Sequence, residues 1–342
     1  MASSDGRLRP RAPVYVGGLD RSGKTTLSGY LASHPNIAIP PVGSNMWTYF
    51  YGQYGDLADP ANYERCLDAL LRYKHVRILE PDPVRITEEF REGPATYARL
   101  FSLFLIHYAE RMGKPRWGAQ TGLIERYADR LIREYDDLRI VHMVRDPRDR
   151  YLASIERWPK GRGRAGGATA RWLYSTRLGE RHRKRHPDQY LLVRFEDLIE
   201  DTEATLKEIC AFLGEDFAPG MLTMDGAPKH RDRLASTTTS GRADVLLSAD
   251  HIGRFAEKVP AEELSYIQDR ARRLMARYGY EPVPISRTPA ERARYRLVDW
   301  PNQFARMVAW RTTEEVQQRL PRFLGRKPGR RMIVDPPPGA GG

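Results

Sequence analysis

The chain has 342 residues, of which 41% are hydrophobic and 29% are charged. This composition excludes a collagen-like, mucin-like or fully disordered chain and predicts a folded protein with its own core. The longest nearly apolar stretch, residues 100–109, is about half of the ~20 residues that a membrane-spanning helix needs. With two cysteines, Cys66 and Cys210, and no apolar core of a secretory signal at the N-terminus, the chain is predicted to be cytoplasmic.

The net charge of +12 is concentrated toward the C-terminal end. From Ser286 onward there are 12 Lys and Arg against 5 Asp and Glu, so this part carries +7 and the first 285 residues carry +5. A basic surface attracts nucleic acid, anionic lipid or a small anionic ligand, and composition does not choose among them. The function must therefore be inferred from motifs.

The predicted elements alternate between strand and helix along the chain. Residues 1–12 are predicted to be a disordered lead-in, and the Gly-rich segments 161–167 and 336–342 a mobile loop and a flexible tail. Strands are predicted at 13–16, 36–39, 116–119, 139–144 and 190–193, and helices at 25–32, 61–73, 95–112, 124–135, after Pro147 and at 202–213. This order predicts a three-layer α/β/α fold with a central, mostly parallel sheet.

Residues Gly18 to Thr25, here called the phosphate loop, match the pattern G-x4-G-K-[ST] between the first strand and the first helix. Glycines let successive N–H groups converge, and the helix N-terminus adds positive potential at the same point. The motif predicts a bound phosphate and a P-loop NTPase-like fold. An ATP-dependent P-loop kinase, with Mg²⁺ held by the loop threonine and a carboxylate, is one function that such a loop serves.

The phosphate loop also resembles the loop of sulfotransferases that use 3′-phosphoadenosine 5′-phosphosulfate (PAPS). That family commonly has R-S-G-T-T-L with His-Pro about one helix later. Here Lys24 replaces the first threonine, and His34-Pro35 follow. The resemblance implies that the 5′ end of the donor is held by Gly18, Arg21, Ser22, Gly23, Lys24, Thr25 and Thr26.

A second segment, Arg145-Asp146-Pro147-Arg148-Asp149, resembles the R-D-P-R-D segment with which the family binds the 3′-phosphate of PAPS. A guanidinium fixed at the end of a strand can hold a phosphate by two hydrogen bonds. The family usually places a serine eight residues after the first arginine, a position that is Ala153 here. The resemblance therefore gives the serine's role to Ser154, one position later.

Further matches follow in the family's order, up to about residue 281. Arg194-Phe195-Glu196-Asp197-Leu198 is similar to the segment whose aromatic residue packs on adenine, and a core position is the alternative for Phe195. The helix up to Gly214 matches the family's pattern. The segment from Ser248 to Phe255 resembles the closing element S-x-x-x-I-G-R-[WF], which implies that Arg254 closes over the cofactor.

The resemblance implies that a sulfuryl group moves from PAPS to an acceptor hydroxyl or amine, with adenosine 3′,5′-bisphosphate released. By analogy with phosphoryl transfer, negative charge then builds on the oxygen that leaves with the nucleotide. Arg21 and Lys24 are the expected catalytic cations beside that oxygen. The scheme requires no metal, and the eight histidines show no metal-ligand spacing.

The sequence does not identify the general base. Many relatives have Lys-Thr on the strand before the second motif, some with a catalytic histidine just beyond, and others use a glutamate after His-Pro. This chain has Gln120-Thr121-Gly122 and no carboxylate in 36–46. Glu125 is the first candidate because it follows a strand at the ligand-binding edge of the sheet. The alternatives are Glu80, Asp82 and His107.

Two segments outside the motifs are interpreted from composition. Within a sulfotransferase domain at 13–285, residues 45–112 are predicted to be a helical insertion on the acceptor side, and their aromatic run suits a sugar or lipid acceptor or a core layer. Residues 286–342 are predicted to be a basic C-terminal helical extension. Its apolar stripe is expected to pack on the chain itself or on a second subunit in a homodimer, with an anionic membrane surface as the alternative. The expected partner is a carbohydrate, glycolipid or small metabolite, not nucleic acid.

Overall fold

The computed structural model describes residues 11–236 and 249–334. At its centre lies a five-stranded sheet in the order β2-β3-β1-β4-β5, in which every neighbouring pair is parallel. The strands are β1 (Arg11–Gly18), β2 (Ile37–Ala38), β3 (Arg116–Gln120), β4 (Arg139–Val144) and β5 (Tyr190–Arg194). The predicted α/β fold with a central parallel sheet is confirmed.

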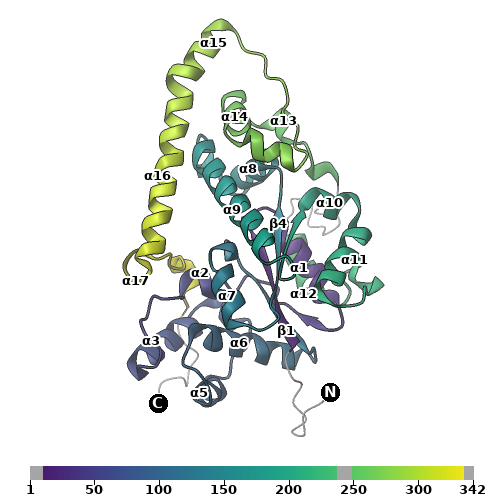
Figure 1. Ribbon diagram of the computed structural model, residues 1–342, viewed down its shortest axis with the longest axis vertical. Helices are drawn as coiled ribbons and strands as arrows, with labels where there is room; N and C mark the ends of the chain where they lie inside the picture. Colours follow the sequence, from purple (N-terminus) through teal and green to yellow (C-terminus); the bar gives the residue numbers. More distant parts are fainter. Residues whose placement is uncertain (1–10, 237–248, 335–342) are drawn as a thin grey trace.

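Helices cover both faces of the sheet (Figure 1). The main ones are α1 (Lys24–Ser33), α2 (Met46–Tyr49), α3 (Pro60–Leu71), α5 (Pro83–Arg91), α6 (Tyr97–Arg111), α7 (Ala128–Glu134), α8 (Pro147–Arg157), α9 (Ala165–Arg185), α10 (Phe195–Glu200), α11 (Thr202–Leu213), α12 (Pro228–Ser236), α14 (Ala261–Arg277) and α16 (Trp300–Arg319). No helix in the described ranges is both long enough and apolar enough to span a membrane.

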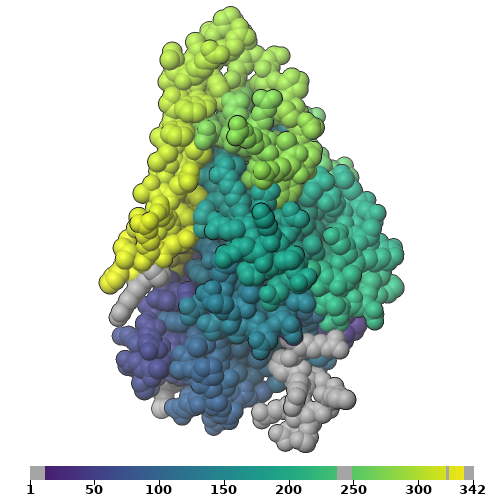
Figure 2. Space-filling model, viewed as in Figure 1, coloured from purple at the N-terminus to yellow at the C-terminus, as the bar shows by residue number. Residues whose placement is uncertain are grey.

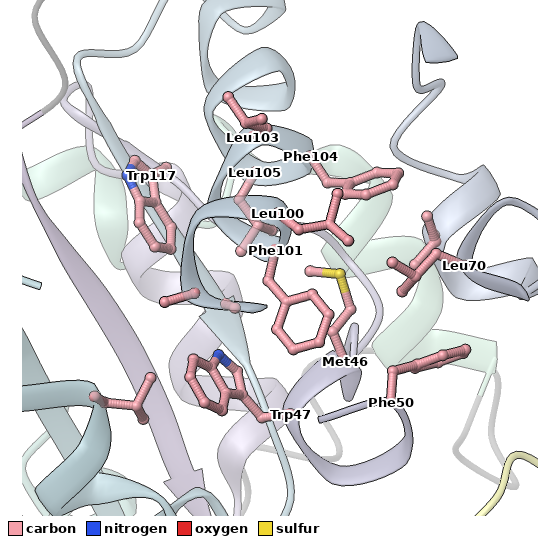
Figure 3. Packing of buried hydrophobic residues seen from close by; sticks show 14 of the residues in the cluster. Met46, Trp47, Phe50, Leu70, Leu100, Phe101, Leu103, Phe104, Leu105 and Trp117 are labelled. Carbon is pink, nitrogen blue, oxygen red and sulfur yellow. The ribbon is translucent and has the colours of Figure 1, made fainter. Parts of the chain in front are cut away.

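The two faces of the sheet carry separate cores because successive strand residues point to opposite sides. Val14 and Val16 of β1 pack with α1 and α11 on one face, whereas Tyr15 packs on the other face with α2, α3 and α6. There the Trp47 ring lies 5.5 Å from the Phe101 ring (Figure 3). The aromatic run is therefore partly a core layer, as one of the two interpretations had it.

We call residues 45–54 the aromatic segment, because its side chains divide between this core and the surface. Trp47 and Phe50 are 1% exposed, whereas Tyr49, Tyr51 and Tyr54 are half-buried at its edge. The edge tyrosines leave aromatic surface available to a ligand.

Three sequence-based boundaries were wrong. Strand β1 begins at Arg11, inside the predicted lead-in, because Arg11 pairs with Arg116 of β3 and the Arg116 Nε donates to the Ala12 carbonyl at 2.6 Å. The predicted helix at 124–135 divides into a 3₁₀ turn, Ile124–Arg126, and α7.

Residues 1–10 and 336–342, including the predicted flexible tail, lie outside the described residues.

The third error concerns 161–167, which is not a loop throughout, because α9 begins at Ala165. The Gln303 side chain of α16 accepts a hydrogen bond from the Gly166 N–H at 2.8 Å and donates to the Gly163 carbonyl at 3.0 Å. A Cβ on Gly166 would lie 1.9 Å from the Gln303 carbonyl oxygen. The lack of a side chain at Gly166 therefore lets α16 approach the start of α9.

The C-terminal extension lies along α9 and then reaches the aromatic segment. Figure 2 shows its yellow surface running down one side of the molecule toward the purple and blue surface of the early part of the chain. Beyond α16, the Gln53 side chain donates to the Arg326 carbonyl at 2.6 Å, and the Val334 N–H donates to the Arg72 carbonyl at 2.9 Å. The apolar stripe thus packs partly on the chain itself, with Met307 3% exposed and Leu297 77% exposed.

Helix α12 packs on α1 and contributes a buried histidine that predicts acid sensitivity. His230 is 3% exposed, and burial lowers its pKa to about 4. In the unfolded chain the pKa is about 6.5. The unfolded state therefore binds an extra proton between these values, so stability present above pH 6.5 is lost as the pH falls toward 4. The loss from this group amounts to about 3 kcal/mol.

Urea unfolding of the wild type and His230→Gln at several pH values tests this. The wild type should lose stability steeply between pH 6.5 and 4, and the variant should show a shallower slope. Parallel slopes for the two proteins would contradict the assignment.

Candidate active site

The phosphate loop stands where the strand order reverses. Strand β1 lies in the middle of the sheet, with β3 on one side and β4 on the other. In open parallel sheets, ligands bind beyond the carboxyl ends of the strands at such a point. Gly18, the last residue of β1, has φ +107°, and a Cβ there would lie 2.3 Å from the Met143 carbonyl oxygen. Only glycine therefore lets the loop leave β1 beside β4.

Hydrogen bonds within the phosphate loop hold its curved shape. The Ser22 hydroxyl donates to the Leu19 carbonyl at 2.7 Å. The Lys24 ammonium donates to the Gly18 carbonyl at 2.8 Å and lies 3.7 Å from Asp20 Oδ1. Burial lowers the pKa of Lys24, although Asp20 acts in the opposite direction. A buried ammonium thus stands at the start of α1, inside the curve of the loop.

Arg145, at the end of β4, touches the phosphate loop directly. Its Nη1 donates to the Arg21 carbonyl at 3.1 Å and its Nη2 to the His251 carbonyl at 2.8 Å. The guanidinium carbon lies 4.3 Å from the centre of the Phe195 ring. A Cβ on Gly23 would lie 2.4 Å from Phe195 Cδ2. The structure therefore brings the three predicted segments together in one place.

Phe195 is 3% exposed and occupies the core position that was the alternative to adenine contact. Its ring packs against both Gly23 of the loop and the Arg145 guanidinium. This packing positions the two cationic elements relative to each other.

The other charged residues of the second motif hold α8 and the segment after it. Asp146 caps α8 by accepting from the Arg148 N–H at 2.8 Å, and the two side chains form an ion pair at 2.6 Å. Asp149 accepts hydrogen bonds from the N–H groups of Gly253 (2.6 Å) and Phe255 (3.0 Å). Asp149 of the second motif therefore anchors the turn at 253–255 to α8.

The anchored turn places Arg254 against α8. Its guanidinium pairs with Glu156 at 2.7 Å, and Glu156 is in turn close enough to act on the pKa of Arg21. Ser154 is half-buried on the same helix. Ser248, the first residue of that closing element, lies outside the described residues.

Glu125, the first candidate for the general base, lies in the interior in this structure. The side chain is completely buried, and it accepts a hydrogen bond from the Ser175 hydroxyl. The Ser175 hydroxyl also contacts His142 at 3.2 Å. The 3₁₀ turn that follows β3 carries Glu125 inward, and its role as the base stays a prediction.

The three alternative bases have structural partners. Asp82 caps α5 by accepting from two backbone N–H groups, and His107 is buried and bonds to Glu89 at 2.9 Å. Glu80 is exposed, and its carboxylate lies 3.8 Å from Arg111. None of these contacts involves the phosphate loop.

Sequence reasoning missed four charged residues around this loop. Arg150 is buried and donates to the Asp20 carbonyl at 3.2 Å, and burial lowers its pKa to about 10. Arg171 and Arg326, from α9 and the C-terminal extension, act electrostatically on Asp20. The missed carboxylate is Asp20 itself. The only sequence signal for Arg326 was the high density of arginine in the tail. Its electrostatic effect on Asp20 joins parts of the chain that are distant in sequence.

A sulfotransferase family model matches residues 13–219, which is more than half of the chain. The chain belongs to the sulfotransferase family. It is therefore an enzyme of sulfuryl transfer, and the match decides against the kinase alternative. A comparison with curated proteins finds no match.

Solved sulfotransferase structures share the fold. The sulfotransferase domain from the Synechococcus PCC 7002 olefin synthase aligns with a TM-score of 0.53 and 20% identity, over 83% of this chain and all of that one. The sulfotransferase domain from the curacin biosynthetic pathway aligns with a TM-score of 0.50 and 14% identity, over 80% of this chain and all of that one. Both fit the five-stranded parallel sheet described above.

Proposed function

We propose that this sulfotransferase takes its sulfuryl group from PAPS and transfers it to a hydroxyl of a carbohydrate, glycolipid or other small metabolite. The contact between Arg145 and the Arg21 carbonyl carries the proposal, because it brings two predicted anion-binding elements together. A single nucleotide with phosphates at its 5′ and 3′ positions has the matching pair of anionic ends.

Unsatisfied donors around the phosphate loop fit an anionic ligand. Among the described residues, the Nε–H groups of Arg21, Arg145 and Arg150 are buried without a hydrogen-bond partner. A buried donor left unpaired is costly, and a phosphate or sulfate oxygen would satisfy it. Three unpaired N–H groups near one loop therefore fit the binding of a highly charged sulfuryl donor such as PAPS.

The roles of the loop residues follow from their positions. The loop's backbone N–H groups and the start of α1 would hold the 5′-phosphate, with Gly18, Ser22, Gly23, Thr25 and Thr26 shaping the cradle. Arg21 and Lys24 would stabilise the charge on the departing oxygen.

At the other end of the donor, Arg145 would hold the 3′-phosphate, with Ser154 and Arg254 as further predicted contacts. Phe195 would fix the distance between the two ends from its place in the core. Adenine contact by this ring stays a prediction.

A cavity of about 350 Å³ beside the aromatic segment is the proposed acceptor site. Its size falls at the lower end of small-molecule pockets. It is lined by Tyr49, Phe50, Gln53, Tyr54, Asp68, Ala69, Arg72, Lys327, Pro328 and Ile333. Half-buried tyrosine rings beside amide and charged groups suit a sugar or a similar hydroxylated molecule.

Homodimer formation and membrane contact stay predictions.

Thermal-shift titration tests the donor. Adenosine 3′,5′-bisphosphate should stabilise the protein without Mg²⁺, with the shift growing as the ligand concentration exceeds its dissociation constant. Stabilisation by Mg·ATP alone would overturn the proposal.

Replacing Arg145 by lysine should weaken adenosine 3′,5′-bisphosphate binding about 10- to 100-fold, because a charge-assisted, two-point hydrogen bond is lost while the positive charge remains. Adenosine 5′-monophosphate, which lacks the 3′-phosphate, should bind the variant and the wild type alike. Isothermal titration calorimetry measures both ligands. Equal weakening of the two would place Arg145 elsewhere on the donor.

A further inference from the structure

Asp20 is an exposed carboxylate within the phosphate loop. Its side chain is 70% exposed, whereas that of Lys24, only 3.7 Å away, is 6% exposed. No other ion pair of Lys24 occurs in the described part of the chain. The loop therefore turns its ammonium inward and presents one carboxylate to the open side.

The open side that Asp20 faces is the side of the aromatic segment. A Cβ on Gly122, just beyond β3, would lie 3.6 Å from Asp20 Oδ1 and 3.7 Å from Lys24 Nζ. Both backbone polar groups of Gly122 form hydrogen bonds with the aromatic segment. Its N–H donates to Asn45 Oδ1 at 3.2 Å, and its carbonyl accepts from the Thr48 hydroxyl at 3.0 Å. Asp20 thus lies on the side of the phosphate loop that adjoins Gly122 and the aromatic segment.

Tyr49 connects Asp20 with that cavity. It lines the cavity, and its pKa is raised by burial and then by the negative charge of Asp20. The charged and titratable groups around Asp20 come from the phosphate loop itself, α1, α2, α8, α9 and the C-terminal extension. They are Arg21, Lys24, Tyr49, Arg150, Arg171 and Arg326. The lining of the cavity thus includes one residue, Tyr49, that lies within electrostatic range of Asp20.

The surroundings keep Asp20 ionised. Lys24 lowers the pKa of Asp20 most, and Arg150, Arg171 and Arg326 act in the same direction. Desolvation by the surrounding protein opposes them, although the side chain itself is open to solvent. An anionic phosphosulfate bound in the loop would engage Lys24 and add negative charge next to Asp20. Both changes raise the pKa of the carboxylate and make it a stronger base when the donor is present.

We propose that Asp20 is the general base that accepts the proton of the acceptor hydroxyl. This assignment rests on the proposed function. The acceptor oxygen forms a bond to sulfur while the bond between sulfur and the bridging oxygen breaks. The electron pair of that bond stays on the 5′-phosphate of adenosine 3′,5′-bisphosphate, and the hydroxyl proton moves to the Asp20 carboxylate. No further reactant is required.

Water serves as the test acceptor, because it is present whatever the natural acceptor is. The measured quantity is the release of adenosine 3′,5′-bisphosphate from PAPS by the wild type, Asp20→Asn and Asp20→Glu. At neutral pH the Asn variant should be slower about 10²-fold or more, the lower end of general-base effects. Its rate should then rise about tenfold per pH unit, as hydroxide replaces the missing base. The wild-type rate should change little over the same range, and Asp20→Glu should recover part of the activity.

A matched variant and a binding measurement separate this role from others. Asp225 has the same 70% exposure and one arginine partner, but it lies beyond the other end of α1, so Asp225→Asn should behave as the wild type. Adenosine 3′,5′-bisphosphate should bind Asp20→Asn as tightly as the wild type or more tightly, since a negative charge beside it is removed.

The outcomes distinguish the two proposals. A wild type that neither binds the bisphosphate nor releases it from PAPS would overturn the proposed donor. A wild type that does both, with Asp20→Asn equally fast and with the same pH profile, would overturn the assignment of Asp20 and leave the donor intact.

Discussion

Replacing Lys24 by alanine should slow sulfuryl transfer on the order of 10²- to 10³-fold, the usual effect of removing one preorganised group that stabilises charge in the transition state. The Lys24 ammonium is buried at the start of α1 and has only the Gly18 carbonyl and Asp20 as partners in the described structure. It is therefore free to exchange these for the departing oxygen of the donor. Initial rates of bisphosphate release from PAPS give the measurement.

The effect should fall on the rate more than on ligand binding. Affinity for adenosine 3′,5′-bisphosphate should drop far less than the rate, since Arg145 and the loop N–H groups remain. Lys207→Ala is the control, because Lys207 is an exposed lysine paired with Glu203 on α11. A Lys24→Ala enzyme within threefold of the Lys207→Ala enzyme would show that this ammonium does not act in the transition state.

Substituting alanine for Gly23 should cost about 3 kcal/mol of unfolding free energy, from two sources. Gly23 has φ +91°, and a left-handed conformation costs an L-residue roughly 1–2 kcal/mol. The new methyl group would also lie 2.4 Å from the buried Phe195 ring, and such overpacking costs about 1–3 kcal/mol. Urea denaturation measures the sum.

Gly214→Ala separates the two sources. Gly214 ends α11 with φ +71°, and a Cβ there meets no atom within 4 Å. This variant should therefore show the backbone cost alone. If both variants lose the same free energy, the ring of Phe195 moves aside without penalty, and the loop is less tightly held than its contacts indicate.

The strands and the phosphate loop could be predicted because their signals are local. The predicted strand at 139–144 is β4 with the same bounds. In the phosphate loop, the glycines and the lysine that form the motif are neighbours in the sequence. The extent of α9 could not be predicted, since its first glycines are explained by Gln303, a residue 137 positions away.

The residue that we propose as the general base was not singled out from the sequence, for a related reason. Glu125 was chosen for its place after β3, but the turn that follows buries it. Asp20 lay within the recognised motif, where its position drew attention to phosphate binding alone. Its exposure and its proximity to Gly122 depend on how β1 and β3 pair, which local sequence does not reveal.

The contact between Gln53 and Arg326 joins positions 273 residues apart, and the cavity wall that it secures includes Lys327, Pro328 and Ile333. The segment after α16 is held by separate hydrogen bonds and ion pairs, such as those of Arg326 with Gln53 and Glu314, so this wall should detach more readily than the sheet unfolds. The hydrogen bonds that join Arg145 to the phosphate loop and hold the loop itself do not involve this wall. On warming, we therefore expect the enzyme to become indiscriminate toward acceptors before it stops binding nucleotide.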